Sequence, residues 1–175
     1  MSGAGAIGTI NLQAGNDSIT LAGNNILNIS NTETVTSSIG SDFLTFTGGG
    51  ATTILASNGF DTFNLSTAAG ANYSIRYAAT SQIGDTVNHF VSSADEFVFS
   101  RAAFLGDGND SNGTLDGNLL DVADGQTSAS TLNTYWVRDS LSNNLYYDAD
   151  HSGSGTGVLV ANLDAAVVAA DITFV

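Results

Sequence analysis

The sequence contains no cysteine and no proline among its 175 residues. The lack of cysteine excludes a disulfide framework, although secretion remains open because a metal ion can stabilise an extracellular domain instead. No run of about eighteen apolar residues occurs, so we expect no membrane insertion. Residues 1–5 lack the charged region and apolar core of a cleavable signal peptide, and any export is therefore expected to use another signal.

Basic side chains are nearly absent. There is no lysine, and three arginines face 17 acidic residues, which gives a formal net charge of −14. Such a surface repels nucleic acid and attracts divalent cations. All but two of the acids are aspartate, a side chain suited to metal ligation from turns. We therefore expect folding to be coupled to Ca²⁺ binding.

The residues needed for catalysis are also scarce. The two histidines, His89 and His151, cannot form a three-histidine zinc site, and no nucleophile elbow is present. Asp95 and Glu96 are adjacent, but neighbours on a strand point to opposite faces, which argues against an acid and base pair. The sequence therefore predicts a chain that is not an enzyme.

The first half of the chain carries a repeat of about nine residues. Short β-favouring clusters recur at steps of 8 to 10 residues, and Gly, Asn, Ser and Asp lie between them. The clusters are centred near Ile19, Leu27, Val35, Leu44, Ile54, Phe63 and Tyr73. Even spacing fits an antiparallel meander or a solenoid, and the shortness of the strands favours the solenoid.

Three turns share the pattern Gly-x-Asp-x-apolar, at residues 15–19, 40–44 and 59–63. This pattern is the second half of the calcium-binding nonapeptide of parallel β-rolls, and the chain resembles a degenerate member of the RTX-type bacterial family. With two strands per coil, Asp42 and Asp61 fall on one edge and Asp17 on the other. We predict a Ca²⁺ site at Asp42 and Asp61, with a metal-free roll that uses aspartate only to form turns as the alternative.

The densest group of acids lies in the glycine-rich stretch 107–124. Its oxygen donors at alternate positions favour a second Ca²⁺ site, for which the candidate ligands are Asp107, Asn109, Asp110 and Asp116. The alternative is a flexible insertion, which the Asn-Gly steps would also fit.

A third candidate site lies near the C-terminus. Asp148, Asp150 and Ser152 occupy every second position and precede Gly153, as in the first half of a calcium loop. The bidentate acid expected at the twelfth position would fall on Leu159, so other segments or water would have to complete the shell. The alternative is a polar turn in which the aspartates bond to their own backbone.

Residues 84–175 resemble the C-terminal target region of bacterial proteins exported by type I secretion. The similarity rests on Gly84-Asp85-Thr86, a hairpin from 134–139 to 144–148, the run 145–154 with His151 in a usual glycine place, a strand at 158–163, a short helix at 164–170 and a terminal segment at 171–175. The resemblance implies an uncleaved export signal that a type I secretion transporter recognises in the unfolded chain, with folding completed outside the cell.

Together these features predict an all-β protein: a degenerate parallel β-roll over 1–80 and a C-terminal β-rich cap over 81–175, continuous as one folding unit. The expected function is that of a non-catalytic, secreted calcium-binding module. It would serve as export signal and folding cap of a bacterial extracellular or cell-surface protein of the surface-layer or adhesin kind. Cell-surface glycans or further copies of the chain are its other expected partners. The alternative is a carbohydrate-binding module of an extracellular enzyme. Its platform would be Tyr135, Trp136, Tyr146 and Tyr147, unless these aromatic residues close the core of the cap.

Overall fold

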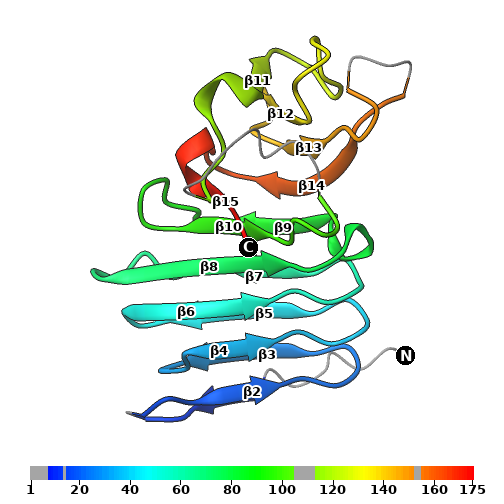
Figure 1. Ribbon diagram of the computed structural model, residues 1–175. Helices are drawn as coiled ribbons and strands as arrows, with labels where there is room; N and C mark the ends of the chain where they lie inside the picture. The colour runs from blue at the N-terminus through cyan, green and yellow to red at the C-terminus, as the bar shows by residue number, and fades with distance from the viewer. Residues whose placement is uncertain (1–7, 14, 105–112, 152–154) are drawn as a thin grey trace.

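The chain is a two-sheet β-solenoid, and the strands within residues 8–99 alternate between the two sheets (Figure 1). The structure is a computed structural model that describes residues 8–13, 15–104, 113–151 and 155–175. Sheet A has the order β1-β3-β5-β7-β9-β14-β13-β12-β11, and sheet B has the order β15-β10-β8-β6-β4-β2. Five coils run from β1 to β10, and β14 and β15 form the sixth.

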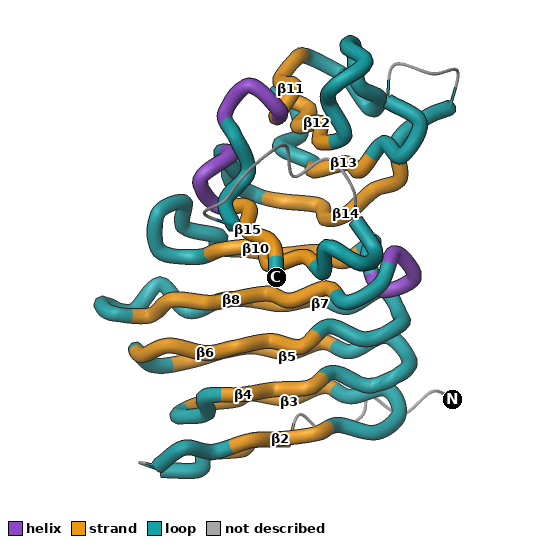
Figure 2. The backbone as a smooth tube through the Cα atoms, viewed as in Figure 1, coloured by secondary structure: helices purple, strands orange, loops and turns teal. Residues whose placement is uncertain are grey.

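The strands of sheet A that belong to the first five coils are β1 (Gly8–Asn11), β3 (Ile26–Ser30), β5 (Phe43–Thr47), β7 (Thr62–Asn64) and β9 (Asp85–Asn88). Those of sheet B are β2 (Ser18–Thr20), β4 (Thr34–Thr36), β6 (Gly50–Leu55), β8 (Ala71–Tyr77) and β10 (Glu96–Phe99). All pairings among these ten strands are parallel. Figure 2 shows them as short segments joined by loops at both edges of the roll.

Apolar side chains stack in register to form a thin core between the sheets. Sheet B aligns Val35, Ile54, Ile75, Phe97 and Ile172 in one column, and each of these is fully buried. Sheet A aligns Leu44, Phe63 and Val87 in the facing column, also fully buried. Because alternate residues of a strand point to opposite faces, polar side chains such as Thr45 and Asn64 lie outside.

The structure confirms the solenoid predicted from the sequence. Each of the seven predicted clusters lies in a separate strand, from β2 to β8, and their parallel pairing excludes a meander. The β1 strand was not predicted, because its only apolar residue is Ile10 and no turn pattern marks it.

The cap continues sheet A and closes sheet B. The strands β11 (Leu120–Ala123), β12 (Trp136–Asp139), β13 (Leu145–Tyr147) and β14 (Val158–Leu163) extend sheet A, and β15 (Ile172–Phe174) pairs in parallel with β10. The antiparallel pairing of β12 with β13 confirms the predicted hairpin, and β14 coincides with the predicted strand. Two short 3₁₀ helices also lie in the described residues of this part, η2 (Gly117–Leu119) and η3 (Ala169–Asp171); a third, η1 (Thr80–Gln82), precedes β9.

The helix predicted over 164–170 is wrong. Only the 3₁₀ turn η3 forms there, and Val168 before it has an extended backbone with φ −116° and ψ 165°. Seven residues are too few for a stable helix without packing on one face. Here the fully buried Val167 and the bond from the His89 N–H to the Asp164 carboxylate (2.7 Å) hold the segment along the end of the roll instead.

Aromatic side chains fill the junction between the roll and the cap. The ring of Phe99 lies 4.4 Å from that of Trp136 and 6.1 Å from that of Phe174, measured between centroids. Phe104 and Tyr147 complete the cluster. Residues from β10, β12, β13 and β15 therefore share one core, and the last strand of the chain contributes to it.

Candidate functional site

A ladder of carboxylates runs along one edge of sheet A. The backbone N–H of Asn25 donates to Asp42 Oδ1 (2.8 Å), that of Asp42 to Asp61 Oδ1 (2.9 Å), and that of Asp61 to Asp85 Oδ1 (2.8 Å). Each aspartate thus accepts a hydrogen bond from the preceding coil. The three carboxylates are at most 2% exposed. The ladder ties four successive coils together at the position where β3, β5, β7 and β9 begin.

The predicted metal ligands Asp42 and Asp61 are neighbours in this ladder, on the edge expected from the sequence. Their side chains point inward and accept backbone N–H groups, and Asp42 also accepts from the Ser38 N–H (2.9 Å). Asp61 Oδ2 is buried and has no hydrogen-bond partner among the described residues. Burial raises the pKa of the Asp61 carboxyl, and the nearby Asp42 carboxylate acts in the same direction.

Asp85 is the most perturbed acid of the ladder. Its Oδ2 accepts a hydrogen bond from the Tyr77 hydroxyl (2.9 Å), and its side chain is fully buried. Burial raises the pKa of Asp85 to about 7, and it raises the pKa of Tyr77 well above its ordinary value. Asp85 was not among the predicted ligands, although Gly84-Asp85-Thr86-Val87 keeps the Asp-x-apolar half of the turn pattern, with the glycine directly before the aspartate.

A second set of acids stands at the edge of sheet B. Glu33 accepts from the Asp17 N–H (2.7 Å), Asp95 from the Tyr73 N–H (2.9 Å), and Asp171 from the Ser93 N–H (3.0 Å). Asp17 lies on the opposite edge from Asp42, as the sequence predicts. Asp95, beside Glu96, is 4% exposed and bound to backbone, so it serves the turn before β10.

The structure describes residues 113–124 of the acidic stretch 107–124. The candidate ligands Asp107, Asn109 and Asp110 lie outside the described residues. Asp116 caps η2 by accepting from the Asn118 N–H (3.1 Å). The two acids that follow also have protein partners: Asp121 binds Ser130 and Gln126, and Asp124 binds Ser140.

The third candidate site brings two carboxylates together. Asp148 is 2% exposed and accepts from the Ala129 N–H (2.8 Å), while the Asp150 N–H donates to its other oxygen (3.3 Å). Burial raises the pKa of the Asp148 carboxyl, and the neighbouring Asp150 side chain adds to the rise. Asp150 accepts in turn from the Gly155 N–H (3.2 Å). Ser152 lies outside the described residues.

His151 has a left-handed backbone, with φ at 59°. This is the conformation that glycine adopts most easily, and it is the one expected where histidine stands in a usual glycine place. Within the described ranges, no three His, Cys, Asp or Glu side chains are grouped closely enough to hold a metal ion. The carboxylates of Asp148 and Asp150 nevertheless lie close enough to repel each other.

The predicted aromatic platform is largely internal. Trp136 is fully buried and Tyr147 is 4% exposed, both within the cap core, whereas Tyr135 and Tyr146 are half-buried. The alternative prediction, that these residues close the core of the cap, is therefore confirmed for Trp136 and Tyr147. A sugar-binding surface built on all four residues would need the rings of Trp136 and Tyr147, which are buried in the core of the cap.

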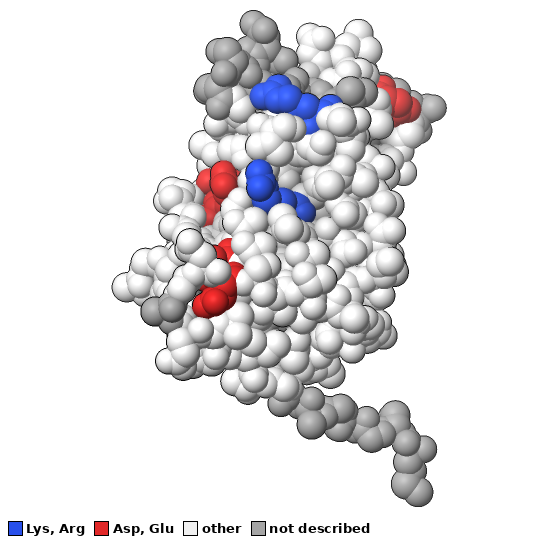
Figure 3. All heavy atoms as spheres, turned by 60° about the horizontal axis from the view of Figure 1, so that its bottom comes forward, with Lys and Arg blue, Asp and Glu red and all other residues white. Residues whose placement is uncertain are grey.

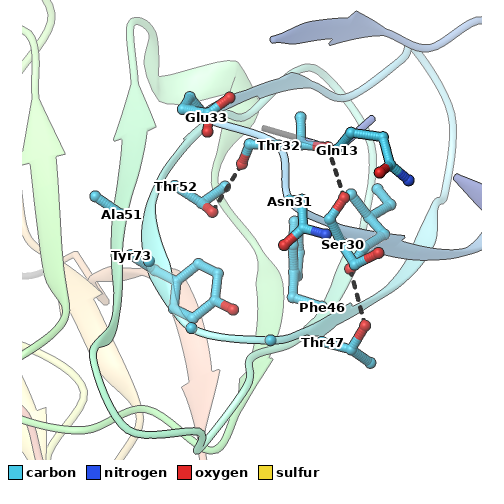
Figure 4. A pocket seen from close by; sticks show the side chains of 14 residues that line it. Gln13, Ser30, Asn31, Thr32, Glu33, Phe46, Thr47, Ala51, Thr52 and Tyr73 are labelled. Atoms are coloured by element: carbon cyan, nitrogen blue, oxygen red, sulfur yellow. Dashed lines mark hydrogen bonds between the residues drawn. The ribbon is translucent and has the colours of Figure 1, made fainter. Parts of the chain in front are cut away.

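Two adjoining cavities lie beside the turns that lead into sheet B. The first has a volume of about 330 Å³, and Figure 4 shows Tyr73 and Phe46 on one side of it and Thr52 bonded to the Thr32 carbonyl (2.9 Å) on the other. The second, about 780 Å³, shares Glu33, Thr52 and Tyr73 with the first. Hydroxyl groups and carboxylates line both cavities, and no histidine lines either.

No helix in the described part of the chain is long and apolar enough to cross a membrane. Comparison with models of protein families finds no match, and no curated protein is similar in sequence.

Proposed function

We propose that this chain is a non-catalytic, secreted, calcium-binding module that acts as the C-terminal export signal and folding cap of a bacterial extracellular or cell-surface protein. Its partner in export is a type I secretion transporter. The proposal joins the sequence resemblance in residues 84–175 with the role of the C-terminal segment in the fold.

The observation that carries the proposal is that residues 158–174 add one strand to each sheet and so complete the sixth coil. β14 pairs in parallel with β9, and β15 pairs in parallel with β10, so the final strands form the sixth coil. Ile172 and Phe174 lie in the core, and the Asp171 carboxylate binds the backbone before β10. Without its last coil, the roll lacks the strands that pair with β9 and β10. Folding is therefore expected to wait until the transporter releases this segment.

The Asp148 and Asp150 turn supports calcium as the ion. The two carboxylates are neighbours and one of them is buried, so they repel each other, and a bound divalent cation would reduce this repulsion. A site of low affinity would be empty at cytosolic Ca²⁺ and filled outside the cell. Binding would then favour the folded state only after export.

Export can be tested by deleting residues 164–175 and measuring the chain in the medium of bacteria that express a type I secretion apparatus. We expect the full chain in the medium and the deletion variant retained in the cells.

The control is Val87→Asp, which places a charge at a fully buried core position and leaves the terminus intact. Because the transporter takes an unfolded chain, this variant should still be exported. Secretion of the deletion variant at the level of the full chain would refute the export role.

A further inference from the structure

The outer face of sheet A in the roll carries no charge. The strands β1, β3, β5, β7 and β9 contain a single charged residue, Asp85, and its side chain is fully buried. Charge on the roll gathers instead beside sheet B, where Glu33, Arg76 and Glu96 line the second cavity. Figure 3 shows one face of the molecule with acidic side chains at one side and arginine side chains beside them. In a chain of net charge −14, an uncharged face that crosses five coils favours a neutral ligand.

Amide and hydroxyl groups form a column on this uncharged face. Because alternate residues of a strand point to the same side, Asn28, Thr45, Asn64 and Asn88 align outward, one from each of four coils. Asn88 Nδ2 donates to Asn64 Oδ1 (2.7 Å), and Asn64 Nδ2 donates to Thr45 Oγ1 (3.3 Å). These bonds fix the amides and leave the Thr45 hydroxyl proton free to be donated to a ligand.

Two exposed phenylalanine rings line a hollow beside this column. Ile26 and Phe43 are register partners that stand two residues before Asn28 and Thr45, and Phe60 lies in the turn before β7. Phe43 is 47% exposed and Phe60 is 74% exposed. With Ile26 they line a cavity of about 510 Å³, within the range of small-ligand sites, roughly 300–1,000 Å³.

The backbone of neighbouring coils supports the side chains that line the cavity. A Cβ atom at Gly84 would lie 2.8 Å from the Phe60 ring, so this ring rests against the turn of the next coil. The Asn24 side chain covers Gly40 in the same way, and a Cβ there would clash with it. The ring and the amide therefore have a fixed surface beneath them, which reduces the entropy lost on binding.

Polar groups with no protein partner complete the lining. Asn24, Ser41 and Thr62 line the cavity, and none of their side chains has a hydrogen-bond partner among the described residues. The one acid in the lining, Asp42, is 2% exposed, and its carboxylate accepts from the Ser38 N–H (2.9 Å). The cavity thus offers aromatic carbon, amides and hydroxyls, but no exposed charge.

We propose that this cavity and the adjoining amide column bind a neutral polysaccharide. A sugar ring has a face of C–H groups that packs on an aromatic ring and a rim of hydroxyls that bond to amides and hydroxyls. Phe60 and Phe43 would take the C–H face, and Asn24 and Ser41 the hydroxyls. The apolar lining is limited to three side chains, whereas the polar column continues over four coils, which fits a sugar chain better than an apolar protein surface.

This site differs from the platform that the sequence placed on Tyr135, Trp136, Tyr146 and Tyr147 of the cap, because it uses none of these residues. Binding on sheet A requires neither calcium nor export. A failure of this proposal would therefore leave the proposed function untouched.

The test is isothermal titration calorimetry of the folded chain with cellohexaose, laminarihexaose, xylohexaose and chitohexaose. Phe60→Ala removes the more exposed ring, and Leu132→Ala is the control, since Leu132 is 76% exposed in the cap and lies outside the cavity. Circular dichroism checks that both variants keep the fold. We expect the wild type and Leu132→Ala to bind at least one of these sugars equally, and Phe60→Ala to bind it about tenfold more weakly, the loss of one stacking contact.

Four results would overturn the proposal. They are a wild type that binds none of the four sugars at millimolar concentration, equal affinities of Phe60→Ala and Leu132→Ala, and tighter binding of the anionic polygalacturonate than of any neutral sugar. The fourth is a loss of sugar binding in Tyr135→Ala that Phe60→Ala does not share, which would place the site on the cap.

Discussion

Replacing Phe174 by alanine is expected to lower the free energy of unfolding by about 3–5 kcal/mol, one of the largest effects of any single change in this chain. Phe174 is 4% exposed and packs against Phe99 and Trp136, at centroid distances of 6.1 and 5.8 Å. The truncation leaves a cavity where roll and cap meet. Urea denaturation followed by circular dichroism measures the loss.

The matched control is Thr173→Ala, in the same strand with its side chain on the opposite face. Its hydroxyl lies 3.3 Å from Glu96 and contributes little, so the loss should stay within about 1 kcal/mol. If Phe174→Ala were no more destabilising than Thr173→Ala, β15 would not close the core, and its role as a folding cap would fail.

Stability is expected to fall as the pH rises from about 4 to about 7. Burial raises the pKa of Asp85 to about 7 from its ordinary value of 3.8, so in this range the folded chain holds a proton that the unfolded chain has released. At about 1.4 kcal/mol for each pH unit between these two values, Asp85 alone accounts for a loss of up to about 4 kcal/mol. Above pH 7 its contribution is constant.

Other acids shape the same profile. Burial also raises the pKa of Asp61 and Asp95, which adds to the loss of stability as the pH rises. Hydrogen bonds from Ser130 and Gln126 outweigh burial and lower the pKa of Asp121, and this acid contributes stability that is lost only as the pH falls below its ordinary range. We therefore expect the greatest stability near pH 4, measured by urea denaturation at each pH.

The variant Asp85→Asn distinguishes the contribution of Asp85 to the pH dependence of stability from that of the net charge. Asparagine keeps an oxygen for the Asp61 N–H and a polar group beside Tyr77, but it does not ionise. The variant should match the wild type at pH 4, exceed it at pH 8, and show a flatter profile between them. An unchanged profile would mean that repulsion across the surface, and not buried Asp85, sets the pH dependence.

Much of the fold could be predicted from the sequence, because a solenoid repeats one local rule in every coil. The steps between Ile19, Val35 and Ile54 identify strands, and Gly-x-Asp identifies the turns at Gly40 and Gly59. The cap was harder to predict. Its segment 164–170 carries alanine and valine that fit either a helix or an extended path, and only the packing of Val167 decides between them.

The sites were predicted less completely than the strands. Asp42 and Asp61 were placed on the correct edge, yet the sequence did not show that their carboxylates bind the backbone of the preceding coil. A metal ligand and a turn-forming aspartate obey the same spacing, so the spacing alone does not tell them apart. Asp85 was missed because Gly84 directly precedes it, so the segment does not match Gly-x-Asp-x-apolar.

Thermal unfolding with and without Ca²⁺ after exhaustive chelation tests the proposed calcium-coupled folding most directly. At 100 times the dissociation constant, Ca²⁺ should add about 2.7 kcal/mol, which corresponds to a rise in Tm of about 5–10 °C for a chain of this size. The variant Asp148→Asn/Asp150→Asn should lose this rise. An unchanged Tm of the wild type in millimolar Ca²⁺ would contradict the proposal.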